Sequence, residues 1–272
     1  MHRYTYGPDA SQYADLYLPD RQRCQGVAVV IHGGYWRSGY AADLGAPLAQ
    51  DLAAHGIVAW NLEYRRAGNG GGWPETFEDV AAGIDKLGDA AAEHGLDLSK
   101  VVALGHSAGG QLAVWAGGRS QLPPEAPGAA DRNAGSVPLT AVVSQSGVLD
   151  LRQAMALNLS NGAVLNFLGG SPAKDPQRYR MADPLQAVPL RVPVSAVYAA
   201  QDITVPPSQS KAYVEADKAA RSAARGEDGG RGSRDGWSTA ELVRVPGDHF
   251  DLIDVRSAAY AVCRELVQKC LS

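Results

Sequence analysis

A serine flanked by glycines stands at position 107, within the motif GHSAG at residues 105–109. An apolar run precedes the motif and an Ala- and Leu-rich stretch follows it, which predicts a strand, a sharp turn and a helix. Such a turn exposes the serine hydroxyl at a helix N-terminus, where free N–H groups favour a developing negative charge. A structural or phosphate-binding glycine turn is the alternative, but the Gly-Lys-Ser/Thr ending of a phosphate loop is absent. We therefore expect Ser107 to be a nucleophile.

Two glycines follow an earlier buried strand, in the motif HGGYW that begins at His32. We expect the N–H groups of Gly33 and Gly34, with that of Ala108 after the serine, to form an oxyanion hole. One such donor stabilises the charge of a tetrahedral intermediate by about 3 to 4 kcal/mol. A plain tight turn is the alternative for an isolated glycine pair. His32 is expected to hold this loop, and Trp36 to pack beside it.

A serine nucleophile needs a base with a near-neutral pKa, and histidine supplies it. Of the six histidines, only His249 lies beyond the later strands, in the loop after the apolar run that ends at Val245. A histidine on a surface loop is the alternative. We expect His249 to take the proton of Ser107 and to return it to the leaving group.

The acid is expected between the serine and the histidine in the chain, and Asp202 follows a strand there. Its carboxylate would accept the Nδ1 proton of the histidine and fix its tautomer. Asp248, Asp251 and Asp254 compete for this role, but a residue on the same loop rarely folds back onto the imidazole edge. Asp150, one strand earlier, is a weaker competitor.

Val- and Ile-rich runs alternate with helical patterns along the chain, which predicts parallel strands and crossover helices. Helices are expected within 44–54 and 80–92, and an antiparallel hairpin at the sheet edge near 13–18. The fold class is therefore α/β, with a mostly parallel central sheet flanked by helices on both faces. The expected parallel strands are Val27–Ile31, Ile57–Leu62, Val101–Leu104, Leu139–Val143, Val192–Tyr198 and Ala240–Val245.

The motifs span both halves of the chain, so residues 1–272 are expected to form one domain. Loop insertions are expected near 121–136, which is rich in Pro, Gly and Ala, and near 221–236, where charged residues and glycines predict mobility. Residues 150–190 are expected to form a lid or pocket segment of unpredicted conformation.

Composition excludes several classes of function. The formal net charge of -4 gives no reason to expect nucleic acid or an anionic membrane as partner. The N-terminus lacks a signal-peptide pattern and no apolar run reaches the roughly 20 residues of a spanning helix, so a cytoplasmic location is expected. Three irregularly spaced cysteines predict neither a disulfide framework nor a metal site. We expect a small-molecule substrate, and no metal or cofactor.

With these motifs in hand, nearly the whole chain resembles the α/β-hydrolases of the arylformamidase (kynurenine formamidase) and hormone-sensitive-lipase-like branch. The resemblance depends on HGGYW, on the serine motif, on Asp202 and His249, and on NLEYR at 61–65, Trp73-Pro74 and Asp79. Tyr35 replaces the third glycine of the lipase version, which favours the formamidases. The resemblance implies the triad and oxyanion hole already named, and hydrolysis of N-formylkynurenine to kynurenine and formate without a cofactor.

Three functions are consistent with these residues. The first is cleavage of a small acyl amide, as in an arylformamidase, through an acyl-serine intermediate. The second is a short-chain carboxylesterase or deacetylase with the same residues, and the third a non-catalytic binding module on this fold. Arg37, Arg65 and Arg152 are the nearest cations for a substrate carboxylate. A homodimer that pairs through an edge strand is also consistent with the resemblance.

Overall fold

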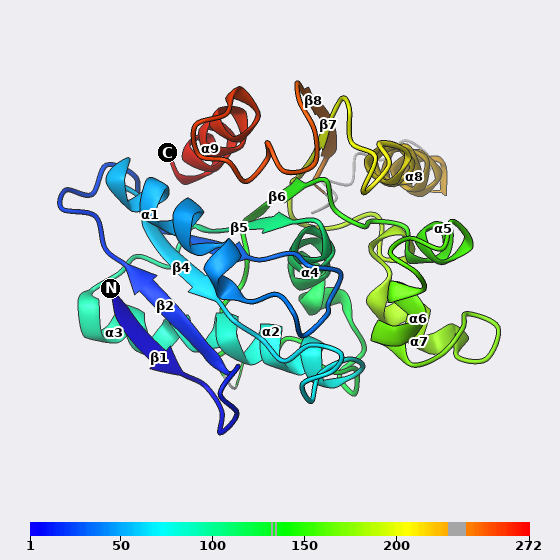
Figure 1. The fold of residues 1–272 in the computed structure, drawn as a ribbon, viewed down its shortest axis with the longest axis horizontal. Coiled ribbons are helices and arrows are strands. Elements are labelled where there is room, and N and C mark those ends of the chain that lie inside the picture. The colour runs from blue at the N-terminus through cyan, green and yellow to red at the C-terminus, as the bar shows by residue number, and fades with distance from the viewer. Residues whose placement is uncertain (132, 134, 228–237) are drawn as a thin grey trace.

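The central sheet of the computed structural model has the strand order β1-β2-β4-β3-β5-β6-β7-β8 (Figure 1). The structure describes all residues except 132, 134 and 228–237. Strand β2 runs antiparallel to β1 and β4, and the other neighbours are parallel. The strands are His2–Thr5 (β1), Tyr13–Tyr17 (β2), Val27–Ile31 (β3), Val58–Leu62 (β4), Val101–His106 (β5), Ala141–Gln145 (β6), Val194–Ala199 (β7) and Ala240–Val245 (β8).

Both faces of the sheet are buried, which is why the inner strands are continuous apolar runs. On β3, Val27, Val29 and Ile31 join the core under helices α2, α3, α4 and α8, whereas Ala28 and Val30 join the core under α1 and α9. Figure 1 shows α1 and α9 together on one side of the sheet and α2 and α4 on the other. The predicted α/β-hydrolase fold is confirmed by this arrangement and by the structural comparisons reported below.

The helices bear out the predicted alternation but not all of its boundaries. The segment 80–92, expected as one helix, falls in two helices that meet at Lys86. The helices are Ala46–Ala54 (α1), Glu75–Asp85 (α2), Leu87–His94 (α3), Ala108–Gly117 (α4), Leu151–Ala156 (α5), Ala163–Leu168 (α6), Pro176–Ala182 (α7), Ser208–Glu227 (α8) and Ala258–Leu271 (α9), with short 3-10 turns at Ala42–Leu44, Arg119–Gln121 and Pro184–Gln186.

Three strands begin later than the sequence suggested, and the first of them, β4, begins at Val58 rather than Ile57. Strand β7 begins at Val194 rather than Val192, because Pro193 has no N–H to donate to a ladder. Strand β6 likewise runs from Ala141 to Gln145 rather than from Leu139 to Val143. The hairpin near 13–18 is present, with β1 as the outer strand.

One expected loop starts too early. Residues 221–227 of the predicted insertion at 221–236 continue helix α8, since its Ala-rich sequence sustains the helix, and the remainder of that segment lies outside the described residues. Residues 150–190 contain α5, α6 and α7. No helix in the described part of the chain is long and apolar enough to cross a membrane.

Candidate active site

Ser107 occupies the turn between β5 and α4, with φ 56° and ψ -118°. A positive φ is costly for a residue other than glycine, so surrounding bonds must hold it. Its N–H donates to Gln145 O at 2.8 Å, and its carbonyl accepts from Gly110 N–H at 2.9 Å. Ser107 is 2% exposed. This is the strand-turn-helix geometry that the GHSAG motif predicted.

Close approaches of backbone explain the glycines of both motifs. A Cβ added to Gly109 would lie 2.1 Å from Ile31 O, so the start of α4 sits directly against the end of β3. A Cβ added to Gly33 would lie 2.9 Å from His106 O and 3.1 Å from Ser107 Cβ. The HGGYW loop therefore lies against the serine turn.

Of the residues predicted to form the oxyanion hole, Gly33 and Ala108 lie beside Ser107. Gly34, with φ +108°, continues the loop beyond Gly33, in a backbone conformation that side chains rarely adopt. Ala108 is the first residue of α4, and the first N–H groups of a helix have no carbonyl partner within it. The backbones of Gly33 and Ala108, from two segments of the chain, thus border Ser107.

His249 and Asp202 are joined by a hydrogen bond of 2.7 Å from imidazole Nδ1 to carboxylate Oδ2. Asp202 follows β7 and His249 follows β8, and they are only 5% and 4% exposed. The other carboxylate oxygen accepts the N–H groups of Thr204 at 2.9 Å and Val205 at 2.8 Å. Burial raises the pKa of Asp202, but the bond to His249 and the backbone donors outweigh it and hold that pKa below its ordinary value.

The competing aspartates have other partners. Asp248 accepts from Phe250 N–H at 2.8 Å, and Asp251 accepts from Asp248 N–H at 2.8 Å, so both shape the histidine loop. Asp254 pairs with Arg256. Asp150 caps α5 by accepting from its first turn. These contacts leave Asp202 as the carboxylate bonded to the imidazole.

The histidine loop contacts the serine turn through His106. Its Nε2 lies 2.9 Å from His249 O, and the centroids of the two rings are 4.4 Å apart at an interplanar angle of 50°. Burial, then the nearby His249, lowers the pKa of His106 to about 3. Ser107, Asp202 and His249 thus follow β5, β7 and β8 at the carboxyl edge of the sheet, where β6 lies between β5 and β7.

A buried polar network that sequence reasoning missed supports the HGGYW loop. His32 contacts Gly33 O through Nδ1 at 2.9 Å and Glu63 through Nε2 at 3.2 Å, and its ring stacks on Tyr64 at 4.4 Å. Glu63 also pairs with Arg66. Burial opposes ionisation of Glu63, but His32 and Arg66 lower its pKa below the ordinary value. His32 has the loop-holding contacts expected of it, and the nearest signal for Glu63 was its place in the NLEYR segment.

The two aromatic residues of the loop differ in exposure. Trp36 is fully buried, stacked on Phe167 at 4.5 Å and donating to Gln111 at 3.0 Å, which is the packing role expected of it. Tyr35 is half-buried, and its hydroxyl donates to Thr204 O at 2.7 Å. Tyr35, at the position of the missing third glycine, therefore links the HGGYW loop to the loop that carries Asp202.

The three arginines that could meet a substrate carboxylate are not equivalent. Arg65 is held by Asp79 through two side-chain bonds of 2.8 and 2.7 Å, so its charge is already paired. Arg37 donates to Ser160 O. Arg152 is exposed. The structure assigns none of them a substrate.

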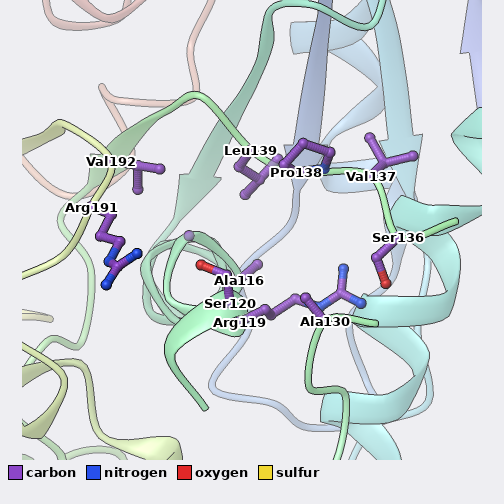
Figure 2. A pocket seen from close by; sticks show the side chains of 11 residues that line it. Ala116, Arg119, Ser120, Ala130, Ser136, Val137, Pro138, Leu139, Arg191 and Val192 are labelled. Atoms are coloured by element: carbon purple, nitrogen blue, oxygen red, sulfur yellow. The ribbon is translucent and has the colours of Figure 1, made fainter. Parts of the chain in front are cut away.

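A cavity of about 500 Å³ lies away from this site, at the other end of α4 (Figure 2). Arg119 lines it, but pairs with Asp85 at 2.7 and 3.0 Å. No group of three or more His, Cys, Asp or Glu residues in the described segments is arranged to hold a metal ion. The cavity residues are Ala116, Gly117, Arg119, Ser120, Ala130, Ser136, Val137, Pro138, Leu139, Arg191 and Val192.

Comparison with solved structures supports the fold. The chain is similar to a truncated carbohydrate esterase from gut microbiota, with a TM-score of 0.73 and 19% identity over 99% of this chain and 96% of that one. It is also similar to esterase 2 of Thermogutta terrifontis, with a TM-score of 0.72 and 23% identity over 98% and 92% of the two chains. At these identities the likeness concerns the fold.

Sequence comparison finds curated esterases. The chain is 26% identical over 226 residues to Esterase LipC of Mycobacterium tuberculosis, which covers 78% of this chain and 54% of LipC. It is 32% identical over 111 residues to a probable isoprenylcysteine alpha-carbonyl methylesterase of Oryza sativa subsp. japonica, covering 40% and 26%. The chain thus spans about half of the first relative and about a quarter of the second. These names do not show the arylformamidase branch that HGGYW suggested. A family model matches residues 14–216, and the chain belongs to the BD-FAE family.

Proposed function

We propose that this protein is a serine esterase that hydrolyses short-chain acyl esters of small molecules through an acyl-serine intermediate. The observation that carries the proposal is the buried 2.7 Å bond between Asp202 and His249, held against the turn that presents Ser107. A structural role alone gives no reason for a strained serine, a paired imidazole and free helix donors at one edge.

In the first half of the reaction, Ser107 Oγ attacks the ester carbonyl and His249 Nε2 takes the hydroxyl proton. Because Asp202 accepts the Nδ1 proton of His249, the imidazole keeps its basic lone pair on Nε2. The same carboxylate stabilises the imidazolium that forms. His249 then donates that proton to the departing alcohol oxygen, which leaves an acyl-serine.

The negative charge of each tetrahedral intermediate falls on the former carbonyl oxygen. Gly33, Gly34 and Ala108 would donate to it, since the loop and the start of α4 border Ser107. These donors are fixed before substrate arrives, so little reorganisation is needed during the reaction. In the second half, His249 deprotonates a water that attacks the acyl-serine, and the carboxylic acid departs.

Two observations support a small acyl group. Ser107 is almost inaccessible, and bulky aromatic residues such as Trp36 and Phe167 pack behind the oxyanion loop. Structures of the similar Thermogutta terrifontis esterase 2 are described as propionate-bound and butyrate-bound. We therefore propose acetyl to butyryl esters as the substrate class.

The test is steady-state hydrolysis of p-nitrophenyl acetate, butyrate and octanoate by the wild type and by Ser107→Ala. We expect turnover that falls with acyl length and is lost in the variant, which should unfold at the wild-type temperature. A fluorophosphonate probe should label the wild type but not Ser107→Ala. Equal activity in the two proteins would refute the assignment of Ser107.

Formamide hydrolysis is the second candidate, and Tyr35 in the place of a third glycine favours it. The same proteins assayed on N-formyl-L-kynurenine distinguish the two. A kcat/KM on the formamide well above that on the acetate ester would replace the proposed ester substrate while keeping the mechanism.

A further inference from the structure

His106, the residue before Ser107, lies against two other segments of the site. His106 is the last residue of β5, and it contacts the peptide carbonyl of His249, 143 positions later. The edge of the same ring faces the oxyanion loop, because a Cβ on Gly33 would lie 3.1 Å from His106 Nδ1. One buried imidazole therefore touches both segments that must meet Ser107.

The contact fixes the protonation of this ring. A peptide carbonyl only accepts, so His106 Nε2 must carry the proton and donate it to His249 O. Burial and the neighbouring His249 keep the pKa of His106 far below neutrality, at about 3. His106 is thus a neutral donor, and it places no positive charge beside the imidazolium that forms on His249.

Other bonds hold the flanks of the histidine loop. Gln201 N–H donates to Gly247 O at 2.9 Å, and Gln145 Nε2 donates to Leu252 O at 2.6 Å. The bond from His106 acts at His249 itself. Asp202 orients the His249 ring about its side-chain torsions, whereas His106 fixes the backbone from which that ring projects.

We propose that His106 is a positioning residue, whose Nε2–H fixes the catalytic histidine loop against the nucleophile turn. This inference rests on the proposed esterase function, because it assigns His106 to the positioning of that reaction's base. Since misplacement of a reacting group by about 1 Å costs on the order of 10²-fold in rate, the effect falls on kcat rather than on substrate binding.

Two amide substitutions separate the hydrogen bond from packing. In His106→Gln the amide nitrogen reaches the position of Nε2, whereas in His106→Asn it reaches only that of Nδ1. Both are neutral and polar, so they differ chiefly in whether they donate to His249 O. We expect His106→Gln to keep kcat on p-nitrophenyl acetate within about threefold of the wild type, and His106→Asn to lose about 10- to 100-fold, with KM nearly unchanged in both.

Further measurements test whether the difference between His106→Gln and His106→Asn comes from the hydrogen bond. Melting temperatures identify a variant that is merely misfolded, and the rate of fluorophosphonate labelling should follow the order of kcat. Histidine-labelled NMR of the wild type needs no substrate, and it should show a neutral Nε2–H ring at His106 down to pH 5. Failure of the wild type to hydrolyse esters or formamides would contradict the proposed function but leave the NMR result standing. Equal kcat in folded Gln and Asn variants, or a charged His106 at pH 5, would overturn the positioning role.

Discussion

Replacing Asp202 by asparagine changes one charge at the centre of the site with almost no change in shape. The carboxylate oxygen that accepts from Thr204 and Val205 N–H groups is well placed to become the amide oxygen, because an NH₂ group there would face two donors. The NH₂ group then points at His249 Nδ1, where the wild type has an acceptor at 2.7 Å. The imidazole of His249 must then accept at Nδ1, so its proton lies on Nε2.

In that tautomer Nε2 already carries a proton and has no lone pair to take the proton of Ser107. The loss of activity is therefore larger than the loss of one hydrogen bond would cause. The corresponding change in a serine protease lowers kcat by about 10⁴-fold, or about 5 kcal/mol in transition-state free energy. The same reasoning applies to Asp202→Asn because the N–H groups of Thr204 and Val205 fix the orientation of the asparagine amide. We therefore expect about 10⁴-fold lower kcat for Asp202→Asn, with KM altered little.

The assay is p-nitrophenyl acetate hydrolysis between pH 6 and 9, with Asp248→Asn as the matched control. Asp248 lies on the same loop as His249, but its Oδ1 accepts from Phe250 N–H at 2.8 Å, and asparagine keeps that acceptor. The kcat of Asp248→Asn should stay within about tenfold of the wild-type kcat. An Asp202→Asn enzyme within tenfold of the wild type, or a control that loses as much as Asp202→Asn, would refute the assignment of the acid.

Two further predictions concern buried groups outside the reaction. Asp183 is 1% exposed, and burial together with Asp150 raises its pKa to about 7. Because the folded state then binds the proton more tightly than the unfolded state, the free energy of unfolding should fall as pH rises from about 4 to 7, by roughly 4 kcal/mol at most. Asp183→Asn removes this pH dependence, so the free energy of unfolding of the variant, measured in urea, should rise relative to that of the wild type between pH 5 and 8. A constant difference between the two free energies would contradict the raised pKa. Burial raises the pKa of the Cys263 thiol to about 12, so a thiol reagent at pH 8 should reach Cys263 only on unfolding. The same reagent should modify the partly exposed Cys24 in the native protein, and Cys270 more slowly, because partial burial raises the pKa of Cys270 as well. Rapid modification of Cys263 in the native protein would count against its burial.

The sequence predicted the fold well because the strand runs and the serine motif each consist of consecutive residues. The run VAVVI at 27–31 is buried on both sides and allows only an inner strand. The GHSAG motif follows such a run, so its turn was predictable, as was the arrival of later strand ends at the same sheet edge. The meeting of Asp202 with His249 followed from chain order and from the rule that parallel strands end together.

The supporting contacts were not predictable because they join residues far apart in the chain. His32 and Glu63 are 31 positions apart, and nothing in either segment alone says that both are buried together. The end of the helix in 221–227 and the helices of 150–190 likewise depend on packing against the sheet rather than on a clear local pattern. Sequence therefore indicated the candidate catalytic groups, and the structure supplied the contacts that hold them.

The need for such holding follows from the strain at Ser107. Its positive φ is stable only because contacts from β6 and α4 fix the turn on both sides, through Gln145 O and Gly110 N–H. A loop free to relax would relieve that strain and lose the alignment of hydroxyl, imidazole and donors. Buried polar groups are costly, and apolar residues would often stabilise the fold as well. The concentration of such groups beneath HGGYW and beside His249 is therefore best explained by the demand for a preorganised site.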